Sequence, residues 1–254
     1  MKLDERVTNK LSDETPTGVV AGLQRMGTEA KLGLAGLAIF VLITILVQWG
    51  LLRALDYSVA TSMQYVENPV LDLWMTVAGD LAVAELSVVY ASVLSFALWR
   101  AGASRWSLAP FAFLLPTVIE LAFKTWIYQP SIPLSLHFHV SGGNVFPSVL
   151  LEGSFPSGHS LRSAFFCTFL AILMWQQRGP FPKLLALVVL LIAPAIGLAM
   201  LYAAWHWTSD VVAGLILGAS FALLVAPPVA TRLDAQRSSF RRSRAGYMGH
   251  GARK

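Results

Sequence analysis

Six stretches of mostly apolar residues follow one another along the chain, separated by shorter and more polar connections. A helix that crosses the hydrocarbon core of a membrane needs about 20 mostly apolar residues. We therefore expect membrane helices over residues 32–52, 80–99, 106–123, 160–177, 184–205 and 211–230. The pattern predicts an all-α fold, a bundle of six transmembrane helices.

Two of the connections have a character of their own. Residues 56–72 carry Val59, Met63 and Val66 at helical spacing among polar residues, which predicts an interfacial segment after the first helix. Residues 124–158 are rich in proline and glycine, which indicates a structured loop between helices three and four. The predicted organisation is an N-terminal tail (1–31), a membrane domain (32–230) and a basic C-terminal tail (231–254).

Composition agrees with a chain surrounded by lipid. Only 13% of the residues are charged, against about 25% in soluble domains. The basic residues behind the net charge of +5 lie mainly in the two tails, where anionic lipid attracts them, so we do not expect nucleic acid as a partner. The single cysteine, Cys167, excludes an internal disulfide. We expect no metal site.

The distribution of Lys and Arg predicts the orientation. With six helices, one side of the membrane receives both tails, with five and seven basic residues, and the connections between helices two and three and between four and five. The other side has only Arg53, Lys124 and Arg162. Because basic residues favour the cytoplasmic side, we expect an inner (plasma) membrane protein with both termini cytoplasmic. The loop over 124–159 and the turn at His206 would then face outward.

Two histidines and an aspartate on that outer side are candidate catalytic residues. A neutral His206 can attack phosphorus if its other nitrogen is held by a carboxylate. Asp210 follows four residues later, about one helical turn, and can fill that orienting role. His159 can protonate the leaving oxygen.

Four further residues are candidates for binding the phosphate: Lys124, Ser157, Gly158 and Arg162. Backbone N–H groups at the start of a helix favour an anion, and Gly158 leaves room for it. Each also has a structural interpretation, an interfacial anchor for the two cations and a helix N-cap for Ser157. Glu120, four residues before Lys124, is placed for a helical ion pair that either holds Lys124 or weakens its charge.

These motifs resemble those of the type 2 phosphatidic acid phosphatase superfamily. The resemblance rests on Lys124, on Pro-Ser-Gly-His over residues 156–159, and on His206 with Asp210, and it covers roughly residues 68–224. It implies a lipid phosphate hydrolase, with no cofactor, that cleaves a phosphomonoester or diphosphate of a lipid through a phosphohistidine at His206.

The sequence departs from the family pattern at two arginines that grip the phosphate in the family. Their positions hold Ser131 and Met200, and Gln129-Pro130 is the nearest approximation to the family's Arg-Pro. Arg162, three residues after His159 on the same helical face, is a candidate substitute.

Three alternatives stay open. The same histidine could serve a lipid phosphotransferase, or the chain could be an inactive homologue that binds lipid or a partner. A transporter is less favoured, because no repeat relates the first three predicted helices to the last three. The lipid head group and the oligomeric state are left open.

Overall fold

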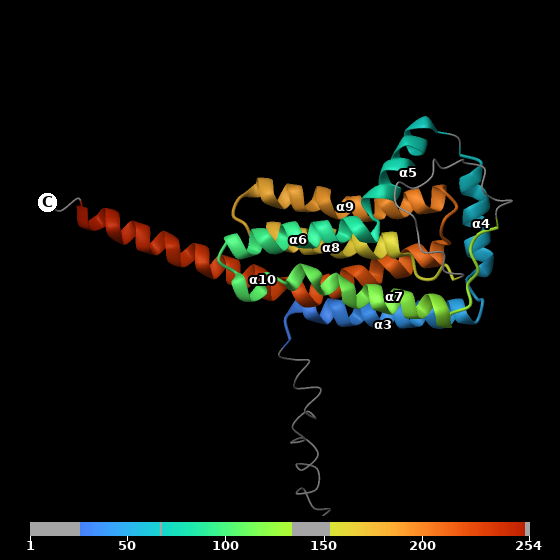
Figure 1. The fold of residues 1–254 in the computed structure, drawn as a ribbon, viewed down its shortest axis with the longest axis horizontal. Coiled ribbons are helices and arrows are strands. Elements are labelled where there is room, and N and C mark those ends of the chain that lie inside the picture. Colours follow the sequence, from blue (N-terminus) through green and yellow to red (C-terminus); the bar gives the residue numbers. More distant parts are fainter. Residues whose placement is uncertain (1–25, 67, 134–152, 252–254) are drawn as a thin grey trace, which may run out of the picture.

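The computed structural model describes residues 26–66, 68–133 and 153–251. Apart from one isolated bridge between Pro130 and Gly153, the regular structure in these residues is helical (Figure 1). In chain order the elements are α3 (Thr28–Gln48), α4 (Arg53–Gln64), α5 (Pro69–Leu81), α6 (Ala84–Arg100), η1 (Ser104–Trp106), η2 (Ala109–Phe113), α7 (Leu114–Trp126), α8 (Gly158–Trp175), α9 (Pro180–Tyr202) and α10 (Thr208–Gly251).

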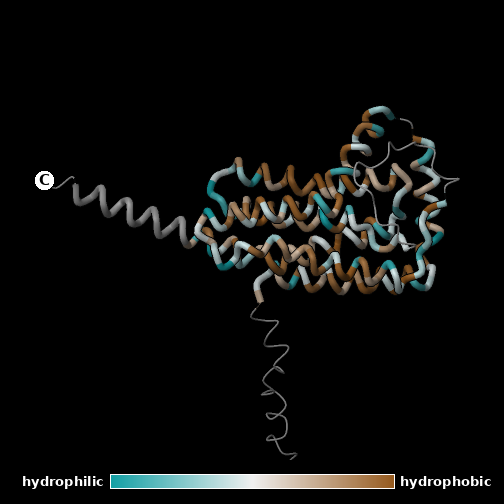
Figure 2. Tube along the Cα trace, viewed as in Figure 1, coloured by the Kyte–Doolittle hydropathy of each residue, from teal (hydrophilic) through white to brown (hydrophobic). Residues whose placement is uncertain are grey.

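Four of the helical segments are long and apolar enough to cross a membrane: α3, the run Ser104–Trp126, α9, and Thr208–Ala235 within α10. The pair α5 and α6 makes a fifth span if its 65° bend is counted within one crossing. The prediction of a helical bundle with several membrane spans is therefore confirmed, with four to five candidate spans where six were expected. The long helices lie side by side, and Figure 2 shows their apolar residues along the middle of the bundle.

The remaining long helix, α8, lies at the centre of the bundle. Eleven of its 18 residues are buried, so protein rather than lipid surrounds it and its polar residues find partners. It packs tightly on α10, because a Cβ atom at Gly214 or Gly218 would overlap the backbone of Ser157 or Leu161. Small residues that let helix backbones approach closely are typical of membrane bundles.

The segment expected in the interface divides into two helices. In Figure 1, α4 lies across the end of the bundle and buries Asp56, Ala60 and Gln64 against it. A new helix, α5, starts at Pro69, where the Asn68 side chain accepts hydrogen bonds from the backbone N–H groups of Val70 and Leu71. The prediction of one segment over 56–72 therefore missed the cap that separates α4 from α5.

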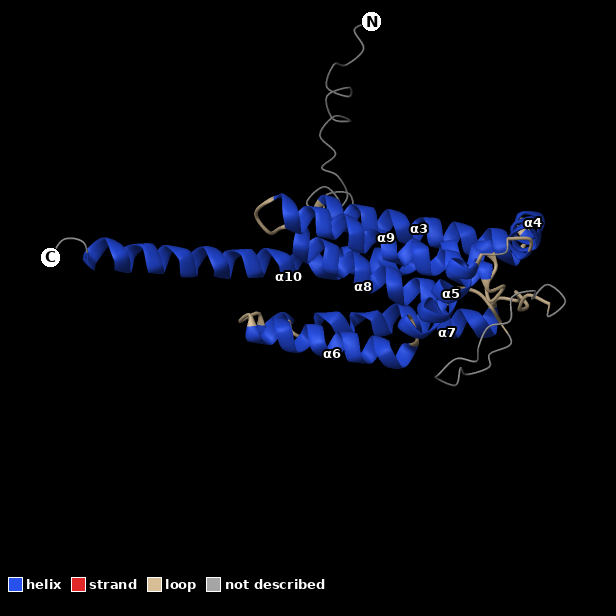
Figure 3. Cartoon of the chain, turned by 90° about the horizontal axis from the view of Figure 1, so that it is seen from above, coloured by secondary structure: helices blue, strands red, loops and turns tan. Residues whose placement is uncertain are grey.

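The last helix is longer than expected. We predicted a membrane helix ending near residue 230, and α10 continues as helix to Gly251. Its C-terminal part projects away from the bundle (Figure 3). The predicted loop between helices three and four is described only at its two ends, and residues 134–152 lie outside the described part of the chain.

Candidate active site

Three separate parts of the chain meet at the end of the bundle covered by α4. They are the end of α7 with Lys124, the start of α8 with His159, and the turn between α9 and α10 with His206. The imidazole rings of His159 and His206 have their centroids 6.3 Å apart. A single phosphate group placed between them can contact both rings, as the predicted chemistry requires.

His206 is held in a tight turn beside Asp210. Ala204 has a φ of 53°, a left-handed conformation that is uncommon for residues other than glycine and that reverses the chain after α9. The His206 Nδ1 atom lies 3.5 Å from Asp210 Oδ2, which also accepts a hydrogen bond from the Trp207 N–H at 3.0 Å. Asp210 is fully buried, so solvent does not compete with His206 for its carboxylate.

The surroundings keep the His206 imidazole neutral. Burial of the side chain lowers the pKa of His206 to about 3, and the positive charge of Lys124 contributes to the same shift. The negative charge of Glu120 opposes it. A neutral imidazole keeps the nitrogen lone pair that a nucleophile needs.

Both histidines carry a buried nitrogen without a hydrogen bond to any described residue. These atoms are His206 Nδ1, facing Asp210, and His159 Nε2. Unsatisfied buried polar atoms are rare in proteins and call for an explanation. A bound anion or substrate would supply the partner that His159 lacks.

Ser157 ties the start of α8 to the start of α10. Its hydroxyl accepts a hydrogen bond from the Ser160 N–H at 3.4 Å, as an N-cap, and its own N–H donates to the Asp210 carbonyl at 3.0 Å. Ser157 is fully buried. The Ser157 N–H is therefore not available to an anion, because it fixes the position of α10.

The two candidate binding cations share one carboxylate. Glu120 Oε1 lies 2.9 Å from Lys124 Nζ, and Glu120 Oε2 lies 3.0 Å from an Arg162 guanidinium nitrogen. The ion pair predicted from the spacing of Glu120 and Lys124 is therefore confirmed. Arg162 also donates to the Ala82 carbonyl at 3.0 Å. Arg162 therefore lies at the site, and its guanidinium group is bound by the Ala82 carbonyl and the Glu120 carboxylate.

The positions of the two missing arginines differ in surroundings. Ser131 is exposed, whereas Met200 is fully buried in an apolar cluster with Ile196 and Val211. An arginine at residue 200 would have to enter that cluster. The chain has repacked this position with apolar side chains.

A hydrogen-bonded network behind Asp210 was not predicted from the sequence. The Gln129 amide donates to Asp210 Oδ1 and to Ser209 Oγ, both at 2.9 Å. The Ser209 hydroxyl and N–H in turn donate to the Asp56 carboxylate, at 2.7 and 2.8 Å. Burial raises the pKa of Asp56, and the hydrogen bonds from Ser209 oppose the shift. The Gln129-Pro130 pair was the signal in the sequence, since it stands near the family's Arg-Pro.

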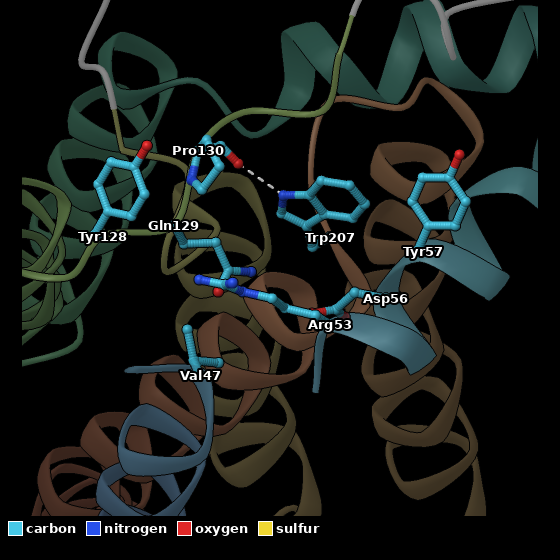
Figure 4. A pocket seen from close by; sticks show the side chains of 8 residues that line it. All are labelled: Val47, Arg53, Asp56, Tyr57, Tyr128, Gln129, Pro130 and Trp207. Atoms are coloured by element: carbon cyan, nitrogen blue, oxygen red, sulfur yellow. Dashed lines mark hydrogen bonds between the residues drawn. The ribbon is translucent and has the colours of Figure 1, made fainter. Parts of the chain in front are cut away.

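A cavity of about 320 Å³ adjoins this network, lined by Val47, Arg53, Asp56, Tyr57, Tyr128, Gln129, Pro130 and Trp207. In Figure 4 the Trp207 indole donates to the Pro130 carbonyl, at 2.8 Å, and the Arg53 side chain reaches toward Gln129. Gln129 therefore lines the cavity and holds Asp210 at the same time.

These features define a multi-pass membrane protein with a site of two histidines, a buried carboxylate and paired cations at one end of its helices. Residues 84–233, more than half of the chain, match the PAP2 superfamily. The chain belongs to the PAP2 superfamily.

A solved structure has the same fold. The chain is similar to the crystal structure of the first transmembrane PAP2-type phosphatidylglycerolphosphate phosphatase from Bacillus subtilis, with a TM-score of 0.63 and 19% sequence identity. The match covers 76% of this chain and 93% of that one. The search of curated proteins gave no match. Family and fold together support a membrane phosphatase-type enzyme.

Proposed function

We propose that the protein hydrolyses the phosphate ester or diphosphate of a membrane lipid, with His206 as the nucleophile. The observation that carries this proposal is the pairing of a neutral, buried His206 with Asp210 on one side and with His159, 6.3 Å away between ring centroids, on the other. The membership in the PAP2 superfamily and the similarity to a phosphatase structure support the same class of reaction.

The proposed reaction has two steps. The free nitrogen of His206 attacks phosphorus, a P–N bond forms, and the P–O bond to the lipid breaks with its electron pair going to the lipid oxygen. His159, which takes up its proton when the negatively charged phosphate binds beside it, gives that oxygen a proton. Water then attacks the phosphohistidine, His159 takes the proton from the water, and the P–N bond breaks to release phosphate and restore His206.

The other candidates have roles that follow from their positions. Asp210 orients His206 and stabilises the positive charge that develops on the ring. Lys124, with its side chain 16% exposed, is the cation that reaches the phosphoryl oxygens. Ser157 and Gly158 shape the start of α8 where the phosphate lies, and Arg162 stands behind it.

The proposed location is the outer face of an inner (plasma) membrane, with six crossings. The four apolar spans become six when the bent pair of α5 and α6 is counted as one crossing and the buried helix α8 as another. Both termini then share the cytoplasmic side, which the basic residues in the tails favour.

Phosphate release in detergent tests this function. The purified protein is incubated with phosphatidic acid, phosphatidylglycerol phosphate and undecaprenyl diphosphate. We expect release from at least one lipid, and a loss of about 10²-fold or more in His206→Ala and His159→Ala. His250→Ala, a histidine of the C-terminal segment, serves as the matched control and should retain the parent's rate.

Two results would contradict the proposal. Phosphate release that continues in His206→Ala would show that His206 is not the nucleophile. Transfer of the phosphoryl group to another lipid, with no free phosphate, would instead support the phosphotransferase alternative.

A further inference from the structure

The Glu120 carboxylate uses both of its oxygens on the two cations of the site. Oε1 pairs with Lys124 at 2.9 Å and Oε2 with Arg162 at 3.0 Å. The Glu120 side chain is 4% exposed, so solvent screens these contacts little. A buried carboxylate in this position cancels one of two positive charges.

Glu120 also lies directly against the start of α8. A Cβ atom at Gly158 would overlap the Glu120 carboxylate and come within 2.8 Å of an Arg162 guanidinium nitrogen. The glycine of the Pro-Ser-Gly-His sequence therefore gives a carboxylate room at the helix N-terminus. Negative charge already occupies part of the region that favours an anion.

The remaining charges near the nucleophile are few. Among the described residues, Lys124, Glu120 and Arg162 act on His206 through their charges, and the Asp210 carboxylate faces its Nδ1 atom. Two positive and two negative charges leave the site without net positive charge. Residues 127–161 and 203–211 contain no Lys or Arg, so these two stretches of the sequence add no further cation. Arg53 lies in the neighbouring cavity, beyond Gln129 (Figure 4).

A lipid monophosphate and a lipid diphosphate make different demands on such a site. When a monophosphate is cleaved, the leaving group is a lipid alkoxide, which needs a proton and which His159 can protonate. When a diphosphate is cleaved, the leaving group is a second phosphate, which needs positive charge on its oxygens. The diphosphate also brings more negative charge into a site whose two cations are already offset by two carboxylates.

We propose that Glu120 is a specificity-determining residue that restricts the site to lipid monophosphates and disfavours lipid diphosphates. This inference rests on the proposed function, whose substrate class it narrows. Glu120 acts through Lys124 and Arg162, by holding both cations in place and by limiting their combined charge.

A matched pair of substrates tests the proposal: farnesyl phosphate and farnesyl diphosphate, which share one hydrocarbon tail. We expect kcat/KM of the parent protein to favour the monophosphate by at least about tenfold. Glu120→Gln removes the charge and keeps the shape, and it should lower that ratio about tenfold, because a carboxylate then no longer offsets the charge of Lys124 and Arg162. Glu85→Gln makes the same change at an exposed carboxylate in the first turn of α6 and should leave the ratio unchanged.

The outcomes separate the two claims. If neither the farnesyl substrates nor the lipid phosphates of the first test are cleaved, or if cleavage survives in His206→Ala, the proposed function fails. If cleavage depends on His206 but the parent protein uses the diphosphate as well as the monophosphate, only the inference on Glu120 is overturned. The ratio of kcat/KM for the two substrates in the parent protein tests the inference even if Glu120→Gln does not fold. If Glu120→Gln folds and its ratio equals that of the parent, the inference on Glu120 is also overturned.

Discussion

At the scale of single residues, burial does most to prepare His206 for chemistry. The ring lies in a turn outside the helices, next to a fully buried Asp210, and its pKa is lowered to about 3 mainly by burial. An ordinary histidine is half protonated near pH 6.5. His206 in the folded protein therefore remains neutral over the whole physiological range, while the unfolded chain does not.

This difference makes stability depend on pH in a definite direction. Above pH 6.5 the ring is neutral in the folded and the unfolded protein, so it does not make the free energy of unfolding depend on pH. As the pH falls below 6.5, the unfolded chain takes up a proton that the folded protein refuses until about pH 3, so the folded state loses stability. At pH 5 the loss is about 2 kcal/mol. Thermal unfolding in detergent at pH 7.5 and pH 5 should show a larger drop for the parent than for His206→Gln, and equal drops would contradict the neutral, buried ring.

Gln129 gives a second prediction at this scale. Its amide donates to Asp210 and Ser209, both at 2.9 Å, and so fixes the carboxylate that orients His206. Gln129→Met keeps the size and removes both hydrogen bonds, so we expect kcat to fall about tenfold to a hundredfold with KM little changed. Steady-state kinetics on the best lipid substrate measures this split. A rise in KM with kcat unchanged would show that Gln129 binds substrate instead.

At the scale of elements, the site depends on how α8 and α10 approach each other. Gly214 and Gly218 lie one turn apart on α10 and bring its backbone against that of α8. The hydrogen bond from the Ser157 N–H to the Asp210 carbonyl then joins the starts of the two helices. Close packing along the helices thus sets the distance between the Pro-Ser-Gly-His segment and the His206–Asp210 pair.

Adding one methyl group at this contact should be harmful. In Gly218→Ala the new Cβ overlaps the Leu161 carbonyl, and overpacking of this kind costs about 1–3 kcal/mol. We expect a lower midpoint of thermal unfolding in detergent and reduced activity. Val212→Ile adds the same group on an exposed face of α10 and should leave both unchanged. Equal stability of the two variants would show that α8 and α10 can move apart without loss.

Apolar length and local motifs predicted most of the elements but not all of their ends. The membrane helices were found because about 20 apolar residues in a row are hard to place elsewhere. The break at Asn68 and the extension of α10 to Gly251 were missed, since a single cap and a helix outside the bundle leave the apolar pattern unchanged.

The candidate site was predicted where its residues lie within a few positions of one another. His206 and Asp210 are four residues apart in the sequence, and so are Glu120 and Lys124. The contacts of Asp56 with Ser209 and of Gln129 with Asp210 join residues 153 and 81 positions apart. Only the packing of α4 and of the segment after α7 on α10 brings them together, and no local pattern records it.

At the scale of the whole molecule, the site lies at one end of the bundle, and the C-terminal part of α10 projects from the other (Figure 1). If the bundle spans the membrane, site and tail face opposite sides. If the basic tails are cytoplasmic, as we propose, the site lies outside the cytoplasm.

Cysteine labelling tests this orientation. The native Cys167 is buried, so a new cysteine at an exposed position gives a clean signal. Tyr128→Cys, beside the site and 77% exposed, should react with a membrane-impermeant maleimide in intact cells. Gln176→Cys, at the exposed end of α8 where it joins the connection to α9, should react only after the cells are opened. The reverse pattern would place the site on the cytoplasmic side.

The central claim is that phosphate passes through a covalent bond to His206. The most direct measurement is mass spectrometry of the protein quenched in base during turnover of its lipid substrate, on the His159→Ala variant, in which hydrolysis of the intermediate is slowed. We expect an acid-labile phosphate on the peptide that contains His206, and its absence in the double variant His206→Ala, His159→Ala. A variant that still turns over with no phosphate on this peptide, or with phosphate on another residue, would contradict the account.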